Sequence, residues 1–436
     1  MSDRAYWPEG VERCSLGKFL AWLGLIGIFL AWGGYGAYRV LGTGIGVTGL
    51  DNYFGFGLWI TFDLAVIALG AGAFFSGFLR YIIRIDDLKN VINLAVIVGF
   101  LCYSGAMLIL VLDIGQPLRA WFGYWHPNVH SMLTEVIFCI TCYCTVLIIE
   151  YLPLILENRV INKNRFCHHL AHNFHVYMPL FAGIGTFLSF FHQGSLGGMY
   201  GVLFGRPFVF REGFFIWPWT FFLFIASAIA SGPAFTMLCA TLMETISGRK
   251  LLGYETKKLL AKISGLLLCF YIFFKIIDTY AWAKGILPGM GLTFDQMFSS
   301  EHGYGKSLLW LELFWFGLLP AVMLLLPSVR NRPVLMYAAA VMAAVGVTIN
   351  RFVFTVQALA IPVMPFDRWT TYIPNWAEWS TTLMVVAYGF LVMSLSHRYL
   401  PIFPQEVKNL APVPVYGITV PVNFILVRTV LKSKKL

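Results

Sequence analysis

Hydrophobic residues gather along the chain into ten long runs that short polar segments separate. A helix that crosses the hydrocarbon core needs about 20 apolar residues, because it rises about 1.5 Å per residue. The runs lack the short alternating segments of outer-membrane strands, so they indicate helices. They predict ten spans, at about Leu16 to Val40, Phe54 to Ile83, Val91 to Leu112, Val129 to Leu156, Val176 to Phe191, Trp217 to Met243, Leu259 to Trp282, Leu308 to Leu326, Val334 to Leu359 and Trp376 to Leu400.

The composition agrees with this pattern. Of the 436 residues, 58% are hydrophobic and 12% are charged, whereas about a quarter of the residues in soluble domains are charged. The mean hydropathy is +0.74. Most of the eight cysteines lie inside apolar runs, so we expect no disulfide framework. The fold class is therefore all-α, a polytopic membrane protein, and we expect the first run to be retained as a span rather than cleaved as a signal peptide.

The formal net charge of +10 suggests an acidic partner only until the basic residues are placed in the chain. If the N-terminus is cytoplasmic, 22 of the 31 lysines and arginines fall in inner loops and tails, eight fall outside and Lys275 lies within a span. This bias orients a membrane protein, so we expect contacts with membrane lipids and none with nucleic acid. It predicts a multi-pass protein of the inner (cytoplasmic) membrane with both termini in the cytoplasm.

A weak internal repeat divides the spans. When the segment from Phe56 to Gly72 is aligned with the segment from Phe215 to Gly232, Trp59 matches Trp219 and Gly72 matches Gly232 at one constant offset. The repeat would relate spans two to five to spans six to nine in parallel orientation. The expected units are residues 1–15 (cytoplasmic N-terminus), 16–50 (first helix and outer loop), 51–200 (first four-helix bundle), 201–360 (second four-helix bundle), 361–404 (tenth helix) and 405–436 (cytoplasmic tail).

Ionisable residues inside the predicted spans concentrate towards the outer side. Such groups cost several kcal/mol in a bilayer unless they are paired or hydrated, so their clusters indicate function. The first half contributes Asp63, Asp113, Glu135 and His192, and the second half contributes Lys275, Asp278, Glu312, Asn350, Arg351 and Glu378. The second set is nearly balanced in charge and could either hold helices together or carry protons. The excess of acids in the first set indicates proton handling or quinone binding, and the deeper Tyr103 and Glu150 could extend a polar path inward.

A polar, glycine-rich segment from Phe191 to Gly198 follows the apolar run that ends at Phe190. We expect the helix to end here, so that His192 and Gln193 face a ligand at the membrane boundary, although an ordinary helix end would look the same. A haem with two histidine ligands is not expected, because only His130 lies near a span on the same side. An iron–sulfur cluster is not expected either, because Cys139, Cys142 and Cys144 lack a fourth thiolate. His168, His172 and His175 could share a helix face, but we expect no metal there.

Two segments resemble motifs of the NrfD/polysulfide reductase membrane subunit family. Asp113 to Pro117 is similar to the family's aspartate-leucine-glycine-arginine-proline motif, with Gln116 in place of the arginine. His192 to Gly197 is similar to the histidine-glutamine-serine-serine-leucine-glycine signature of the ten-span branch. The resemblance extends from about Gly10 to Pro404. Within the family it is greatest to the membrane subunit of a sulfite-reduction-associated complex, and next to that of a quinone reductase complex.

The resemblance implies a subunit of a respiratory redox complex without a redox centre of its own. It would bind menaquinone near the outer face, exchange electrons with an extracytoplasmic iron–sulfur protein, and assemble with a multihaem cytochrome c and further membrane and cytoplasmic subunits, with or without proton translocation. The candidate residues are His192, Asp63, Asp113 and Glu135 for proton transfer, His192, Gln193, Arg119, Trp121 and Tyr103 for the quinone, and Lys275, Asp278, Glu312, Arg351, Glu378 and Glu150 for a proton path or for pairs that hold helices together. The alternatives are a secondary transporter or ion channel, or a purely structural anchor.

Overall fold

The computed structural model describes residues 3–8, 10–201, 213–214, 217–289, 291, 293–297, 306–360, 368–403, 413–415 and 418–420. Among these residues, ten helices are long and apolar enough to cross a membrane, which confirms the predicted all-α, ten-span fold. Six of them are continuous α-helices up to the middle of the chain: α1 (Leu16–Thr43), α2 (Leu58–Tyr81), α3 (Ile92–Asp113), α5 (Met132–Leu156), α6 (Arg165–Gly201) and α7 (Trp219–Ser247). The tenth is α16 (Trp376–Tyr399).

The three remaining spans each contain a π-helical segment, in which the backbone makes one residue more per turn. They are α8 (Tyr254–Ala281) continued by η6 (Trp282–Ile286) and α9 (Leu287–Gly289); α11 (Lys306–Trp310) continued by η7 (Leu311–Leu318) and α12 (Leu319–Leu325); and α14 (Pro333–Phe352) continued by η8 (Val353–Gln357) and α15 (Ala358–Ala360). Such segments are rare and frequently occur at functional sites. No feature of the hydropathy pattern predicts them.

Short elements connect the spans. The 3₁₀ helices are η1 (Asp3–Tyr6), η2 (Ile45–Val47), η3 (Asp86–Asn90), η4 (Pro117–Arg119) and η5 (Ile161–Lys163), and the short α-helices are α4 (Phe122–Trp125), α10 (Phe294–Met297) and α13 (Pro327–Arg330). Two small antiparallel pairs join β1 (Gly213–Phe214) to β2 (Trp217–Pro218) and β3 (Val413–Val415) to β4 (Ile418–Val420). Most of the predicted cytoplasmic tail lies outside the described residues.

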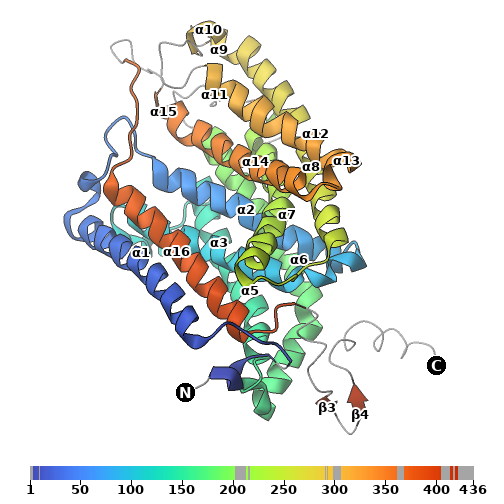
Figure 1. Cartoon of the computed structure of the whole chain (residues 1–436). Helices are drawn as coiled ribbons and strands as arrows, with labels where there is room; N and C mark the ends of the chain where they lie inside the picture. Colours follow the sequence, from blue (N-terminus) through green and yellow to red (C-terminus); the bar gives the residue numbers. More distant parts are fainter. Residues whose placement is uncertain are drawn as a thin grey trace.

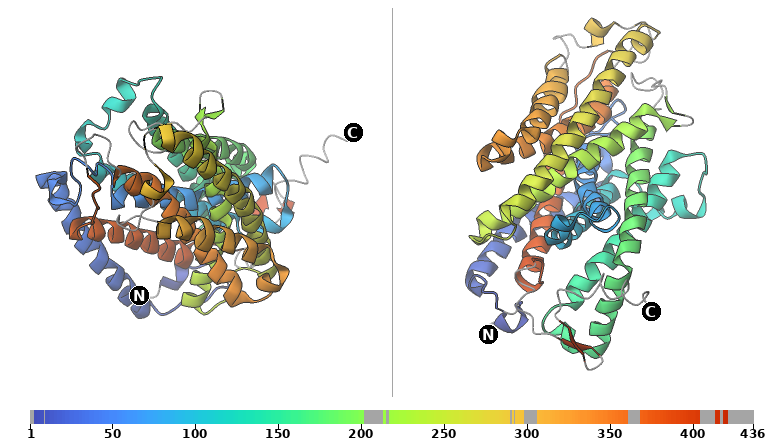
Figure 2. Two further views of the ribbon diagram at one scale, coloured as in Figure 1. Left: turned by 90° about the horizontal axis from the view of Figure 1, so that it is seen from above. Right: turned by 90° about the vertical axis from the view of Figure 1, so that its right-hand side faces the viewer.

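The spans pack as two groups around α2 and α7, which lie against each other. We call α2, α3, α5 and α6 the first bundle, and α7, α8, α11–α12 and α14 the second bundle. The first and last spans, α1 and α16, run side by side along the first bundle (Figures 1 and 2). The α1 helix is mostly exposed, as expected of a helix that faces lipid or another subunit.

The crossing of α2 and α7 is a contact between two glycines. A Cβ atom placed on Gly72 would lie 2.2 Å from the carbonyl carbon of Gly232, and one placed on Gly232 would lie 2.1 Å from the Cα of Gly72. Two helix backbones can approach this closely only where both residues are glycines, whose side chain is a single hydrogen atom. These are the two glycines that the proposed repeat aligns, so the contact is compatible with the repeat, which itself stays a prediction.

Helix α6 differs most from expectation. It was expected to end near Phe191, but it continues to Gly201. Its glycines are packing positions: Cβ atoms on Gly194, Gly197 and Gly198 would meet the Phe221 ring, the Thr220 carbonyl oxygen and the Met132 sulfur at 2.3 to 2.5 Å. Close packing against α5 and α7 therefore offsets the low helix propensity of glycine.

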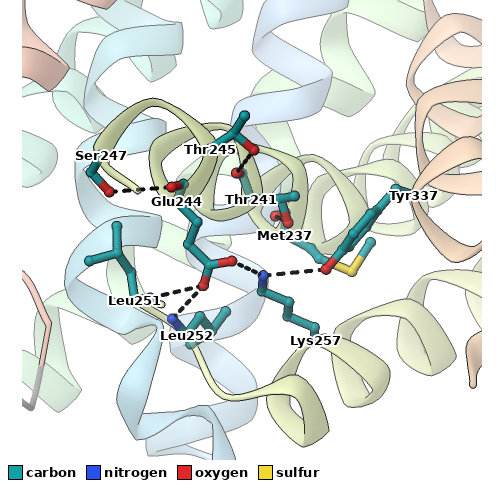
Figure 3. A network of polar contacts seen from close by, with 9 residues as sticks. All are labelled: Met237, Thr241, Glu244, Thr245, Ser247, Leu251, Leu252, Lys257 and Tyr337. Carbon is teal, nitrogen blue, oxygen red and sulfur yellow. Dashed lines mark hydrogen bonds and ion pairs between the residues drawn. The ribbon is translucent and has the colours of Figure 1, made fainter. Parts of the chain in front are cut away.

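The end of the second bundle at which α8 follows α7 is held by a buried ion pair (Figure 3). Lys257 Nζ lies 2.5 Å from Glu244 Oε2, and it lies 3.4 Å from the Tyr337 hydroxyl. The other carboxylate oxygen of Glu244 accepts hydrogen bonds of 2.9 Å from the backbone N–H groups of Leu251 and Leu252. One carboxylate thus joins the end of α7, the following turn and the start of α8.

The N-terminal segment is attached to the end of α16. Arg398 Nε donates a hydrogen bond of 2.6 Å to Asp3 Oδ2, and its guanidinium lies 4.3 Å from the centroid of the Phe19 ring. Asn158 donates to the carbonyl oxygens of Tyr6 and Tyr399 at 3.1 and 2.8 Å. The hydrogen bond from Arg398 lowers the pKa of Asp3 to about 2, so the carboxylate stays ionised at neutral pH.

Candidate functional site

An acidic group lies near the start of α2 and the end of α3, in the first bundle. Asp63 on α2 is 4% exposed, and it is close enough to Asp113 at the end of α3 for the two carboxyl groups to repel each other. The buried hydroxyl of Tyr200 on α6 interacts electrostatically with both. One oxygen of each carboxyl group has no hydrogen-bond partner among the described residues. We call Asp63, Asp113 and Tyr200 the acid group.

A second polar group lies deeper in the same bundle. His192 is fully buried, and neither ring nitrogen has a hydrogen-bond partner of ordinary geometry in the described part of the chain. The same holds for both amide atoms of the neighbouring Gln193. The Tyr103 ring centroid lies 5.8 Å from that of the imidazole, and its hydroxyl lies 3.2 Å from Ser189 Oγ. We call His192, Gln193, Tyr103 and Ser189 the histidine group.

Two further buried hydroxyl groups in this region make no hydrogen bond of ordinary geometry within the described residues. They belong to Tyr143, whose ring centroid lies 4.1 Å from that of Tyr103, and to Thr220 at the start of α7. Buried polar atoms are nearly always satisfied in folded proteins, because leaving one unpaired costs about 1–3 kcal/mol. So many in one place indicate a site that a polar ligand or water completes.

The acid group and the histidine group lie at different positions along α6. Both are linked to α6, where His192 and Tyr200 are eight residues apart, or about 12 Å along the axis. Leu196 is buried on α6 midway between them. Glu135 is half-buried in the first turn of α5, and its carboxyl group interacts electrostatically with Cys139, one turn further along the helix. The structure therefore brings Asp63 and Asp113 together, and the imidazole of His192 lies within reach of the Val136 backbone, next to Glu135.

Arg119 and Trp121 lie on the outer connection between α3 and α5. Arg119 is exposed in η4, and Trp121 is 49% exposed with its ring centroid 4.2 Å from that of Phe122. Because His192 and Gln193 are enclosed, these two candidates do not contact them. They lie on the surface of the chain instead.

Polar groups continue from the histidine group towards the end of α5 and the start of α6. Glu150 is buried on α5, two turns beyond Tyr143, and it lines a cavity of about 20 Å³ together with His175, Tyr81 and Asn93. This is enough space for about one water molecule. His175 Nε2 lies 2.6 Å from Glu157 Oε1 at the inner margin. The Phe74 ring, which contacts Tyr143 at a centroid distance of 4.1 Å, lies between the histidine group and the cavity.

Lys275, Glu312, Asn350 and Arg351 of the second bundle form one buried network. Lys275 Nζ lies 3.3 Å from Glu312 Oε1, which also accepts a hydrogen bond of 2.7 Å from the Asn350 amide. Arg351 donates to Asn350 Oδ1 at 2.6 Å and to Ser227 Oγ at 3.0 Å. The contacts join the four spans of the bundle. Asp278 is half-buried on α8, three residues beyond Lys275.

Glu378 is fully buried and heavily hydrogen-bonded. Its carboxylate accepts hydrogen bonds from the Gly49 backbone at 2.7 Å, from the Asn375 backbone at 3.0 Å and from the Tyr372 hydroxyl, and it completes a capping box with Asn375 at the start of α16. The Tyr372 hydroxyl in turn accepts from the Leu58 backbone N–H at 2.8 Å. Burial raises the pKa of Tyr372, so its hydroxyl keeps the proton that it donates. These contacts hold the starts of α2 and α16 together.

The structure gives no metal site within the residues that it describes, since no three histidine, cysteine or acidic side chains are grouped suitably there. Two members of the inner histidine cluster have other contacts: His168 Nδ1 lies 3.0 Å from the Asn162 side-chain oxygen, and His175 is paired with Glu157. The absence of a haem or an iron–sulfur cluster stays an expectation.

Sequence reasoning missed Tyr200 and Thr220 as candidates. Tyr200 follows His192 and Leu196 at a spacing of four residues. A helix predicted to continue through the glycines would therefore have placed Tyr200 on the same face as His192. Thr220 gives no comparable signal. Threonines at helix starts are common, and their hydroxyl groups usually form hydrogen bonds with the nearby backbone.

Comparison with known proteins gives consistent results. The family model described as polysulphide reductase, NrfD, matches residues 46–363. A menaquinone reductase integral membrane subunit of Nitratidesulfovibrio vulgaris is 70% identical over 406 residues, which cover 93% of this chain and 97% of the relative. A selenate reductase subunit of Mesobacillus selenatarsenatis is 21% identical over 428 residues, with 89% of this chain and 93% of the relative covered. Each of these relatives is a subunit of a reductase.

Proposed function

Since this chain belongs to the polysulphide reductase NrfD family of integral membrane proteins, we propose that it is the quinone-binding membrane subunit of a menaquinone-linked reductase complex. The substrate would be menaquinone or menaquinol, bound in the first bundle. The observation that carries the proposal is the concentration of buried polar atoms without partners around α6, in the histidine and acid groups.

The dimensions of the site support a quinone ring. If the ring lies along α6 beside Leu196, one oxygen is directed towards His192 and the other towards Tyr200 and Asp63. The two ends are about 12 Å apart along the helix, and two hydrogen bonds of about 2.8 Å leave about 6 Å, the scale of one ring with opposed oxygens. The apolar flank suits a lipophilic headgroup, and the polar ends orient it. Since the groups are enclosed in this structure, we infer that side chains between them move to admit the ring.

Quinone chemistry combines two electrons with two protons, and the chain provides groups for the protons. Each quinone oxygen needs a titratable partner within hydrogen-bond reach. We assign this role to His192 at the inner end and to Asp63 at the outer end, where the proximity of Asp113 favours one shared proton. Gln193 and Tyr103 would orient the ring through hydrogen bonds.

Proton exchange with the inner side is a further part of the proposal. Tyr143, Glu150 and the cavity beside His175 form the route, with Phe74 as the apolar step that a water chain must pass. If both termini are cytoplasmic, as the distribution of basic residues predicts, this route opens to the cytoplasm.

Electrons would enter or leave through another subunit. We propose an extracytoplasmic iron–sulfur protein and a multihaem cytochrome c as partners, with Arg119 and Trp121 on the surface that meets them. The named activity of the 70% identical relative favours a menaquinone reductase as the host complex over a sulfite-reduction-associated one.

The test is quinone-dependent turnover of the intact complex with His192→Ala and Gln193→Leu variants. We expect His192→Ala to lower turnover by at least about 100-fold, the lower range for removing a general acid or base. Gln193→Leu removes only hydrogen bonds that orient the ring, so we expect a smaller loss, with the other subunits still copurified in both variants. His169→Ala is the matched control, because His169 is exposed near the start of α6. Unchanged turnover in His192→Ala would refute the assignment.

A further inference from the structure

Two buried threonines connect the second bundle to the helix that carries Asp63. Thr61 Oγ1 on α2 and Thr355 Oγ1 in the π-helical segment η8 lie 2.7 Å apart. Both side chains are buried, and no sequence motif marks either of them. The contact crosses between the two bundles.

The direction of this hydrogen bond follows from counting protons. A hydroxyl group has one proton to donate. The Thr355 hydroxyl lies 2.9 Å from the carbonyl oxygen of Arg351, which can only accept, so Thr355 donates to it. Thr61 must therefore donate to Thr355. The result is an oriented pair of hydrogen bonds from α2 to the backbone at Arg351.

Arg351 is a fixed end for this connection. Its guanidinium is fully buried, lies 3.7 Å from the centroid of the Phe224 ring, and donates to Ser227 and to the Phe224 carbonyl oxygen on α7. Through Asn350 it is joined to Glu312 and Lys275. A cavity of about 10 Å³ beside Ser227 and Glu312 could hold no more than about one water molecule. A network packed so closely has little freedom to move.

Asp63 lies two residues beyond Thr61 on α2, so the two side chains point about 200° apart on the helix. One face of α2 therefore meets the second bundle, and the opposite face carries Asp63 towards Asp113 and Tyr200. Further along α2, the contact between Gly72 and Gly232 fixes the distance to α7. Together the threonine pair and the glycine crossing hold α2 at two points.

We propose that Thr61 and Thr355 are positioning residues, through which the buried charge network of the second bundle sets the position of the Asp63 carboxyl group for proton transfer to a quinone. This inference rests on the proposed function of the first bundle. It gives the second bundle a role in the reaction although none of its charged residues touches the substrate.

The test compares Thr355→Val, Thr355→Ser and Thr348→Val in the intact complex. Thr348 is the matched control, because it is half-buried on α14 and its hydroxyl donates to the Ala344 carbonyl oxygen within the same helix. We expect Thr355→Val to lower kcat about tenfold with little change in KM, Thr355→Ser to retain most of the activity, and Thr348→Val to behave as the wild type.

A double variant separates positioning from folding. Thr355→Val alone leaves the Thr61 hydroxyl buried without an acceptor, whereas Thr61→Val with Thr355→Val removes both partners and can be nearly neutral for stability. We expect the double variant to assemble normally and to keep the tenfold lower kcat. Wild-type kcat in Thr355→Val or in an assembled double variant would overturn the inference.

An infrared measurement distinguishes this inference from the proposed function. The carboxyl band that disappears in Asp63→Asn identifies Asp63 in the purified complex without turnover. We expect the frequency of this band to shift in Thr355→Val and not in Thr348→Val. If quinone turnover is absent even in the wild type, the proposed function fails, and an unshifted Asp63 band independently refutes the coupling.

Discussion

Replacing Lys257 by methionine tests how much the buried pair at the inner end of the second bundle contributes to stability. The Lys257 side chain is 3% exposed and that of Glu244 is 16% exposed, so little solvent screens their contact of 2.5 Å. Removing one partner of a buried pair costs about 3–5 kcal/mol, because the other charge stays buried. Glu244 still accepts two backbone hydrogen bonds, which places the expected loss near the lower end, at about 3 kcal/mol.

The assay is unfolding of the purified chain by sodium dodecyl sulfate in mixed micelles, followed by tryptophan fluorescence. Since about 1.4 kcal/mol corresponds to a factor of ten, the unfolding constant should rise roughly 100-fold. The neighbouring Lys258→Met is the control, because Lys258 pairs with an 86% exposed Glu255 side chain and should contribute at most about 1 kcal/mol. Equal losses in the two variants would refute the reasoning that burial sets the difference.

Three further predictions follow from separate parts of the structure. Gly72→Val would put side-chain atoms into the Gly232 backbone, so we expect no monodisperse protein in gel filtration. Gly34→Val is the control, because Gly34 lies on an open side of α1. Recovery of well-folded Gly72→Val would contradict the described crossing. The pKa of Asp3 is lowered to about 2 from its ordinary 3.8, so its ion pair stabilises the N-terminal segment fully above pH 3.8 and is lost as the pH falls through 2; a carboxyl-carbon NMR titration with a midpoint near 3.8 would disagree. Glu150→Gln should slow quinone reduction at least about tenfold if protons come from the inner side, and an unchanged rate in proteoliposomes would exclude this route.

The sequence predicted the spans well because a bilayer imposes one strong requirement, about 20 apolar residues per helix. It failed at α6, where glycine and polar residues indicated a helix end. The decisive contacts there, of Gly194 with Phe221 and of Gly198 with Met132, join helices that are distant in the sequence. Packing of this kind has no local signal.

The candidate site was predicted in part. Intramembrane charge identified His192, Asp63 and Asp113, since buried ionisable groups are rare without a function. Their relative depth depends on helix tilt and on how far α6 extends, so the sequence alone does not give it. Arg119 was a candidate as a cation of the acid-rich first half, and the structure places it on the surface.

The π-helical segments and the threonine pair could not have been predicted. Thr355 lies in the π-helical segment η8 and meets Thr61 of α2 across the two bundles. Hydroxyl side chains in membrane helices usually bond within their own helix. Only the three-dimensional arrangement distinguishes this threonine from Thr348.

Photoaffinity labelling of the intact complex with an azido-menaquinone analogue, followed by mapping of the labelled residues by mass spectrometry, tests the central claim most directly. We expect label on α6 between His192 and Tyr200 and on the facing part of α2 near Asp63, with competition by excess menaquinone. Competable label confined to the second bundle or to other subunits would contradict a quinone site in the first bundle.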